Sequence, residues 1–288
     1  MHIFVSTAMY DYETTLEAME LVESVISQYD GRVGMDIPLL VHSPEYQRML
    51  QQKIPDLRPY PISVKSPYLG SEIIAPKGTT EHHKLIKNCT YAFFMARMLG
   101  SPTLTLRTQD QIVSPDSQQS LNPNVFENLE ALSYLGRQCN ITLNIENAGG
   151  NSECCPMFNA DDFIELFENF PEIDCVLDIE RCIKEKWNLP HIVSTLEDCI
   201  VAYRLCNLGN PEDPFALSGR NLEQFFNLYR IYTPDASLIL EYDYKPGCTS
   251  LDLRHSIETL IQGIGRIPDP ISPFRNAHAG MRWALQKV

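Results

Sequence analysis

The sequence alternates short apolar runs with longer amphipathic segments along almost its whole length. The apolar runs span residues 3–7, 33–41, 60–69, 102–108, 141–147, 174–179, 199–205 and 237–243. The amphipathic segments follow them at 14–28, 44–52, 79–99, 123–138, 160–169, 189–198, from 221 onwards and at 250–265. A chain in which each strand leads into a helix builds a parallel sheet with the helices packed outside it. Eight such units predict a single α/β domain over 1–288, a closed (β/α)8 or TIM barrel, which typically needs about 250 residues.

Residues 268–288 follow the last of these units and form a proline-rich tail. The sequence leaves open whether this tail packs under the barrel, covers its mouth or contacts a second subunit. The N-terminus lacks a basic leader, and no run approaches the roughly 18 apolar residues that a membrane span needs. We therefore expect a cytoplasmic protein without a membrane partner.

The formal charge is −14 at pH 7, and the sequence has no basic run. Binding to nucleic acid depends on Lys and Arg neutralising phosphates, so no nucleic-acid partner is expected. The nine cysteines are scattered without CxxC pairs, which favours free thiols over a disulfide framework. The adjacent Cys154 and Cys155 are interpreted as ordinary loop cysteines.

Charged residues occupy the last inward-facing positions of six of the eight predicted strands, and two further polar or charged residues lie just beyond strands six and seven. In barrels of this kind the site lies at the carboxyl ends of the strands, where the loops converge. Burying an unpaired charge is costly, so we expect these groups to face one another or a polar ligand. The set consists of Lys65, Arg107, Glu146, Asp178, Arg181, Arg204, Asn207 and Glu241.

Six segments resemble, in order, motifs of the xylose isomerase-like barrels, a group that contains sugar isomerases, ketose 3-epimerases and endonuclease IV. The segments are SVKSPYL (63–69), NIENAGG (144–150), VLDIERC (176–182), YRLCN (203–207), FALSGRNLEQFF (215–226) and LILEYD (238–243). The resemblance implies a (β/α)8 barrel that acts on a sugar or sugar phosphate. It also implies self-association, so a homo-oligomer is expected.

The resemblance implies a metal site from which this sequence departs. In the family, carboxylates on strands five, six and eight join a strand-seven histidine around a divalent metal. The acids remain as Glu146, Asp178 and Glu241. If these three alone held a metal, Mn²⁺, Mg²⁺ or Zn²⁺ would be the alternatives.

The family's histidine positions, however, have become cationic residues. They are Lys65, Arg107, Arg181 and Arg204. A guanidinium stays protonated and cannot ligate a metal, but it can neutralise clustered carboxylates. We therefore predict no cofactor and no metal ligands. Four cations against three acids would leave one positive charge, which favours a small anionic or sugar-like ligand.

The leading hypothesis for the function is a sugar isomerase or epimerase. The resemblance implies that Glu146 and Glu241 move a proton beside a carbonyl, work that suits two facing carboxylates. The ligand would be bound by Lys65, Arg107, Asp178, Arg181, Arg204 and Asn207.

Two other functions remain to be weighed against this one. A non-catalytic barrel that binds a ligand or partner could carry the same residues as a relic network of ion pairs. An open mouth would favour the enzyme, whereas a mouth filled by direct Arg–carboxylate contacts would favour the relic. Endonuclease IV-like DNA repair is disfavoured, because its metal-binding histidines are missing and the net charge is unsuitable for DNA.

Overall fold

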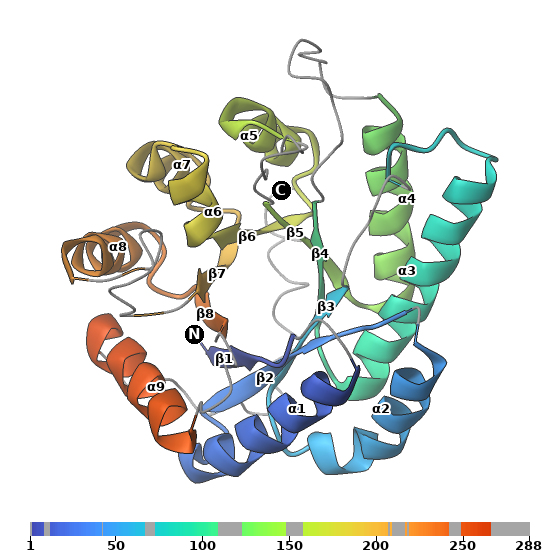
Figure 1. The fold of residues 1–288 in the computed structure, drawn as a ribbon. Helices are drawn as coiled ribbons and strands as arrows, with labels where there is room; N and C mark the ends of the chain where they lie inside the picture. Colours follow the sequence, from blue (N-terminus) through green and yellow to red (C-terminus); the bar gives the residue numbers. More distant parts are fainter. Residues whose placement is uncertain are drawn as a thin grey trace, which may run out of the picture.

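The computed structural model describes residues 2–8, 12–41, 43–66, 73–108, 123–147, 158–206, 208, 217, 219–241 and 249–265. Within these ranges eight parallel strands pair in sequence order, and pairing of the first with the last closes the barrel. The helices surround the barrel on the outside (Figure 1). The predicted single (β/α)8 barrel is therefore confirmed. The tail at 268–288 and the pair Cys154–Cys155 lie outside the described residues.

The strands and helices alternate as the sequence pattern predicts. The strands are β1 (Ile3–Ser6), β2 (Val33–Pro38), β3 (Ile62–Ser66), β4 (Thr103–Arg107), β5 (Thr142–Glu146), β6 (Asp174–Asp178), β7 (Ile200–Cys206) and β8 (Ser237–Glu241). The helices are α1 (Tyr12–Ile26), the 3-10 turn η1 (Ser27–Tyr29), α2 (Pro44–Leu57), α3 (Thr80–Leu99), α4 (Pro123–Cys139), α5 (Ala160–Asn169), α6 (Ile179–Lys184), α7 (Leu189–Thr195), α8 (Gly219–Tyr232) and α9 (Ser250–Ile264).

The ends of helices α3 and α2 follow from local features of the sequence. Thr79 is the N-cap of the helix predicted over 79–99, since its side chain accepts a hydrogen bond from the His82 backbone N–H. Gly100 ends that helix with a φ of 77°, a conformation that favours glycine. Helix α2 runs on past residue 52 through Pro55, because Ile54 and Leu57 continue its buried face. The short helix α6 was not expected. None of the described helices is long and apolar enough to cross a membrane.

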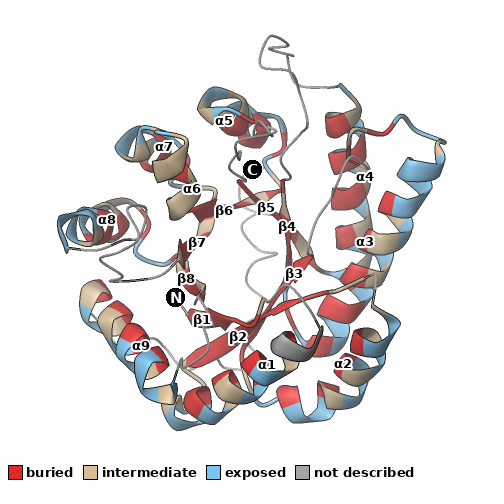
Figure 2. Ribbon diagram, viewed as in Figure 1, coloured by how far each residue is buried: buried red, intermediate tan, exposed pale blue. Residues whose placement is uncertain are grey.

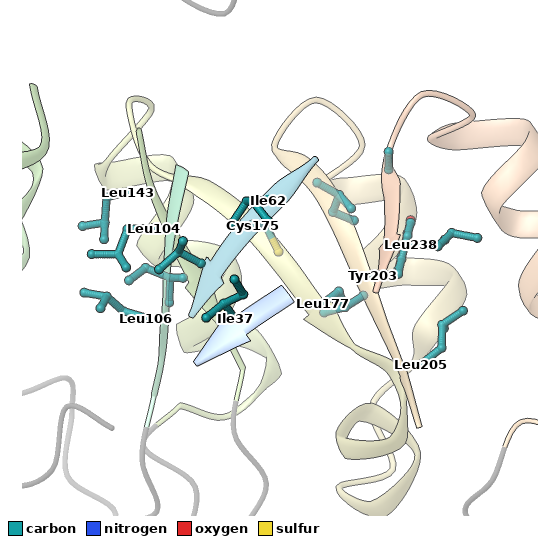
Figure 3. Close-up of a cluster of buried hydrophobic side chains, with 14 of the residues drawn as sticks. Ile37, Ile62, Leu104, Leu106, Leu143, Cys175, Leu177, Tyr203, Leu205 and Leu238 are labelled. Atoms are coloured by element: carbon teal, nitrogen blue, oxygen red, sulfur yellow. The ribbon is translucent and has the colours of Figure 1, made fainter. Parts of the chain in front are cut away.

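The apolar core lies between the barrel and its helices. Side chains alternate along each strand, so every second residue points outward into this layer. The outward residues belong to one buried apolar cluster together with the inner faces of the helices (Figure 2). Figure 3 shows part of this layer at Ile37, Ile62, Leu104, Leu106, Leu143, Cys175, Leu177, Tyr203, Leu205 and Leu238.

The inward positions of the strands are much more polar. A separate apolar cluster contains the buried residues Val176, Ala202 and Ile239, with Phe4 packed against them. Thr105 is in register with both Lys65 and Asn144 on the neighbouring strands, so these three share the inward face. The barrel is therefore filled by polar and charged groups toward its mouth, and their placement decides what the site can do.

A close approach of the chain at Gly34 helps to place one of these inward groups. A Cβ atom at Gly34 would lie 2.2 Å from the Pro61 carbonyl oxygen, so only glycine fits at this point of β2. Asp36 lies two residues further along β2, on the same face as Gly34.

Candidate functional site

Glu146 is the centre of the polar cluster. It ends β5, is fully buried, and is surrounded by three cations. Its Oε2 accepts a hydrogen bond from Arg204 Nε at 2.6 Å. Its Oε1 lies 3.2 Å from Lys65 Nζ and 3.6 Å from Arg107 Nε. The sequence therefore predicted correctly that these charges face one another.

Arg204 connects this centre to two further strands. It lies on β7 and is fully buried, and its Nη1 donates to Asp36 Oδ2 at 3.0 Å and to Glu241 Oε2 at 3.2 Å. Its Nη2 has no hydrogen-bond partner among the described residues. One guanidinium thus joins carboxylates from β2, β5 and β8.

The rim of the cluster is held by longer contacts. Lys65 Nζ lies 3.8 Å from Glu241 Oε2, and Arg107 Nη2 lies 3.8 Å from Asp178 Oδ2. The side chain of Glu241 is 28% exposed and that of Arg107 is 14% exposed, whereas the side chain of Glu146 is inaccessible. Glu241 is therefore the member of the expected catalytic pair that a ligand can reach.

Asp178 is fixed at the end of β6 by two neighbours. Its Oδ1 accepts from the Arg181 backbone N–H at 3.1 Å and so caps helix α6. The Asn147 side chain accepts from the Asp178 backbone N–H at 2.6 Å and donates to its carbonyl at 3.2 Å. The amide of Asn147 thereby continues the hydrogen bonding between β5 and β6 beyond the last paired residues.

Sequence reasoning missed Asp36 and Asn147 as members of the site. Asp36 is fully buried on β2, and its signal was a single carboxylate inside the apolar run 33–41. Asn147 follows Glu146 directly within the Glu-Asn motif, and it is also buried. Both are polar residues at positions where an apolar side chain would be expected, and each has a charged or backbone partner.

One predicted residue is not brought into the cluster, and another cannot be placed. Arg181 supplies its backbone N–H, and its guanidinium forms no ion pair with any described residue. Asn207 lies outside the described residues. The expected excess of one positive charge is not found in the described site, which holds three cations and four carboxylates. They are Lys65, Arg107 and Arg204 with Asp36, Glu146, Asp178 and Glu241.

These surroundings shift the pKa values of the carboxylates in opposite directions. Burial raises the pKa of Glu146, but the charges of Arg204, Lys65 and Arg107 outweigh burial and bring the pKa to about 2. The pKa of Glu241 is also lowered, since Lys65 and Arg204 outweigh its burial. Burial, with repulsion from the two glutamates, raises the pKa of Asp178 from 3.8 to about 6. Of these three carboxylates, Asp178 is the one whose pKa lies closest to neutral pH.

The donor set does not fit a divalent metal. The oxygens that would bind one are already held by Arg204, Lys65 and Arg107, and a guanidinium has no free lone pair for a metal. Among the described residues, no group of three or more His, Cys, Asp or Glu side chains is arranged as a metal site.

The raised pKa of Asp178 gives a testable pH dependence. The folded state holds this proton more tightly than the unfolded chain, so its ionisation lowers stability as pH rises from about 4 to about 6. Asp178→Asn keeps the cap of α6 and removes the titration. The stability difference between variant and wild type should shift by about 3 kcal/mol in favour of the variant across that window. Urea unfolding at each pH measures it, with exposed Asp161→Asn as control, and parallel curves would contradict the assignment.

Comparisons with known proteins agree with this architecture. No known sequence family and no curated protein sequence matches the chain. Among solved structures, an L-ribulose 3-epimerase superposes with a TM-score of 0.68 at 12% identity, covering 100% of this chain and 98% of that one. A 3-keto-D-glucoside 4-epimerase from E. coli gives 0.67 at 14%, covering 91% and 99%. A D-tagatose 3-epimerase-like protein gives 0.68 at 15%, covering 92% and 97%. These three neighbours are named as sugar epimerases or as epimerase-like, and at this level of identity the likeness shows a shared fold.

Proposed function

We propose that this chain is a sugar isomerase- or epimerase-like protein that transfers a proton through carboxylates at the barrel mouth without a divalent metal. One observation carries the proposal: Glu146 and Glu241 share the same two cations. Lys65 Nζ lies 3.2 and 3.8 Å from their carboxylates, and Arg204 contacts them at 2.6 and 3.2 Å. Two acids held side by side beside fixed positive charge are the parts that such a proton transfer needs.

We assign the proton transfer to Glu241, the accessible member of this pair. The lowered pKa of Glu241 keeps it ionised at neutral pH, so it can accept a proton from the carbon beside a carbonyl. The enediolate that results carries negative charge, which Lys65 and Arg107 at the rim can stabilise. The buried Glu146 supports this step indirectly, because its carboxylate holds both of these cations in place.

The charges in the site point to an uncharged ligand. In the described part of the site three cations face four carboxylates, so an entering phosphate would add to an excess of negative charge there. A free sugar, whose hydroxyl groups both donate and accept hydrogen bonds, suits paired charges better. We therefore favour a neutral polyhydroxyl substrate over the anionic alternative. The sugar epimerases with the same fold support this choice, while a cytoplasmic location and a homo-oligomer stay predictions.

Proton exchange into free sugars tests the proposal. The protein, treated with chelator and checked for metal by elemental analysis, is incubated in D₂O with a panel of ketoses and aldoses. NMR should detect deuterium at the carbon beside the carbonyl of at least one sugar. Exchange that disappears with chelator and returns with Mn²⁺ would contradict the metal-free mechanism. No exchange with any sugar would contradict the enzymatic hypothesis as a whole.

A non-catalytic, ligand-binding barrel is the second candidate, and one observation favours it. Each of the four carboxylates is in direct contact with Arg or Lys, so ion pairs fill the described part of the mouth. A sugar that binds in calorimetry but never exchanges its proton would support this function. In that case Glu146→Gln should alter stability alone.

A further inference from the structure

Arg204 sits within a cage of three carboxylates that come from three separate strands. We name this set, Asp36, Glu146 and Glu241 around the guanidinium, the Arg204 cage. One oxygen of each carboxylate lies within 3.2 Å of a guanidinium nitrogen, at 3.0, 2.6 and 3.2 Å in that order. The acids therefore converge on one small volume inside the barrel.

The cage contains polar atoms whose capacity is not used. Asp36 Oδ1 and Arg204 Nη2 are buried and have no hydrogen-bond partner among the described residues, whereas Glu146 Oε1 is held by ion pairs to Lys65 and Arg107. Arg204 is also the only described cation within 4 Å of the Asp36 carboxylate. Without the guanidinium, Asp36 would keep no counter-charge among the described residues, and the carboxylate oxygens that Arg204 now contacts would face the space that is left.

We propose that the Arg204 guanidinium is the built-in cation of this cage, and that the cage binds a hard divalent cation once the guanidinium is removed. Three carboxylates repel one another and need positive charge to stay ionised together. Mg²⁺ and Mn²⁺ prefer such oxygen ligands and complete their shells with water. Asp36, Glu146 and Glu241 would supply the protein oxygens.

Arg204→Ala tests this inference, with Mn²⁺ as the probe. The variant should bind one Mn²⁺ about tenfold or more tightly than wild type, measured by calorimetry and by the Mn²⁺ EPR signal. Arg107→Ala is the matched control, since it removes the same charge from the rim but leaves the cage occupied. Equal tightening in both variants would overturn the inference, because it would reflect net charge rather than the cage.

Further variants separate binding from folding. Asp36→Asn added to Arg204→Ala should abolish the new binding, and its persistence would overturn the proposed ligand set. If Arg204→Ala is unfolded alone, Mn²⁺ should restore a cooperative thermal transition. An Arg204→Ala or Arg204→Gln chain that gains neither binding nor stability from excess Mn²⁺ would overturn the inference. The readout is metal binding, so the outcome of this test does not depend on whether the protein turns over a sugar.

Discussion

Replacing Arg204 with methionine is expected to lower the free energy of unfolding by about 3–5 kcal/mol at neutral pH. Methionine replaces most of the side-chain volume, so the loss reports on the charge rather than on a cavity. The change leaves Asp36 and Glu146 buried, the first without a cation and the second without its 2.6 Å partner. Removing one partner of a buried ion pair is costly, because the remaining charge stays buried without a counter-charge.

Urea unfolding of Arg204→Met, with Arg107→Met as matched control, measures this effect. Arg107 makes its contacts at 3.6 and 3.8 Å from the rim, so its loss should be smaller, about 1–2 kcal/mol. The cost at Arg204 should also shrink as the pH falls, because Glu146 without this guanidinium takes up a proton at a higher pH than in the wild type. Equal losses of unfolding free energy in the two variants would show that the buried Arg204 adds no more stability than an arginine at the rim.

Glu241→Gln is expected to lower kcat for sugar proton exchange by about 10²–10⁴-fold while KM changes little. Glutamine keeps the shape of the side chain but cannot accept the proton. Glu146→Gln should cause a loss as well, because the cations at the mouth lose the carboxylate that holds them. The rates are measured by deuterium incorporation under saturating sugar.

The two glutamate variants require one control for folding and one control in which a glutamate outside the site is substituted. Thermal melting shows whether each variant is folded at the assay temperature. Glu45→Gln removes a glutamate from the exposed side of α2, with a side chain 62% exposed, and should leave the rate unchanged. Undiminished exchange in folded Glu241→Gln would exclude Glu241 as the base.

The sequence predicted much of the site because charges that end apolar strands must meet in a closed barrel. Lys65, Arg107, Glu146, Arg204 and Glu241 all followed from this reasoning. The motifs of the resemblance likewise implied a (β/α)8 barrel, and this fold is confirmed. The fold could be predicted from the regular alternation of strand and helix, which tolerates errors of several residues at each boundary.

The errors in predicting the site follow from where strands end. The run 33–41 was predicted as one strand, but β2 stops at Pro38, and Asp36 lies inside the strand on the same inward face as Pro38. Arg181 lies past the end of β6, where Asp178 starts a helix and the backbone direction changes. Arg181 is half-buried, and its guanidinium forms no ion pair with a described residue. Neither residue is the last of its strand: Asp36 lies two residues before the end of β2, and Arg181 lies three residues beyond the end of β6.

The charges of the site are divided unequally between the two halves of the chain. Strands β2 to β4 supply one carboxylate and two cations, and strands β5 to β8 supply three carboxylates and one cation. The contact between Asp36 and Arg204 spans 168 residues of sequence. Such non-local contacts form late in folding, because a long loop must close before they are made. The described groups give the first half a net charge of +1 and the second half a net charge of −2, so each half offsets part of the charge of the other, and the Asp36–Arg204 contact makes this compensation across the barrel.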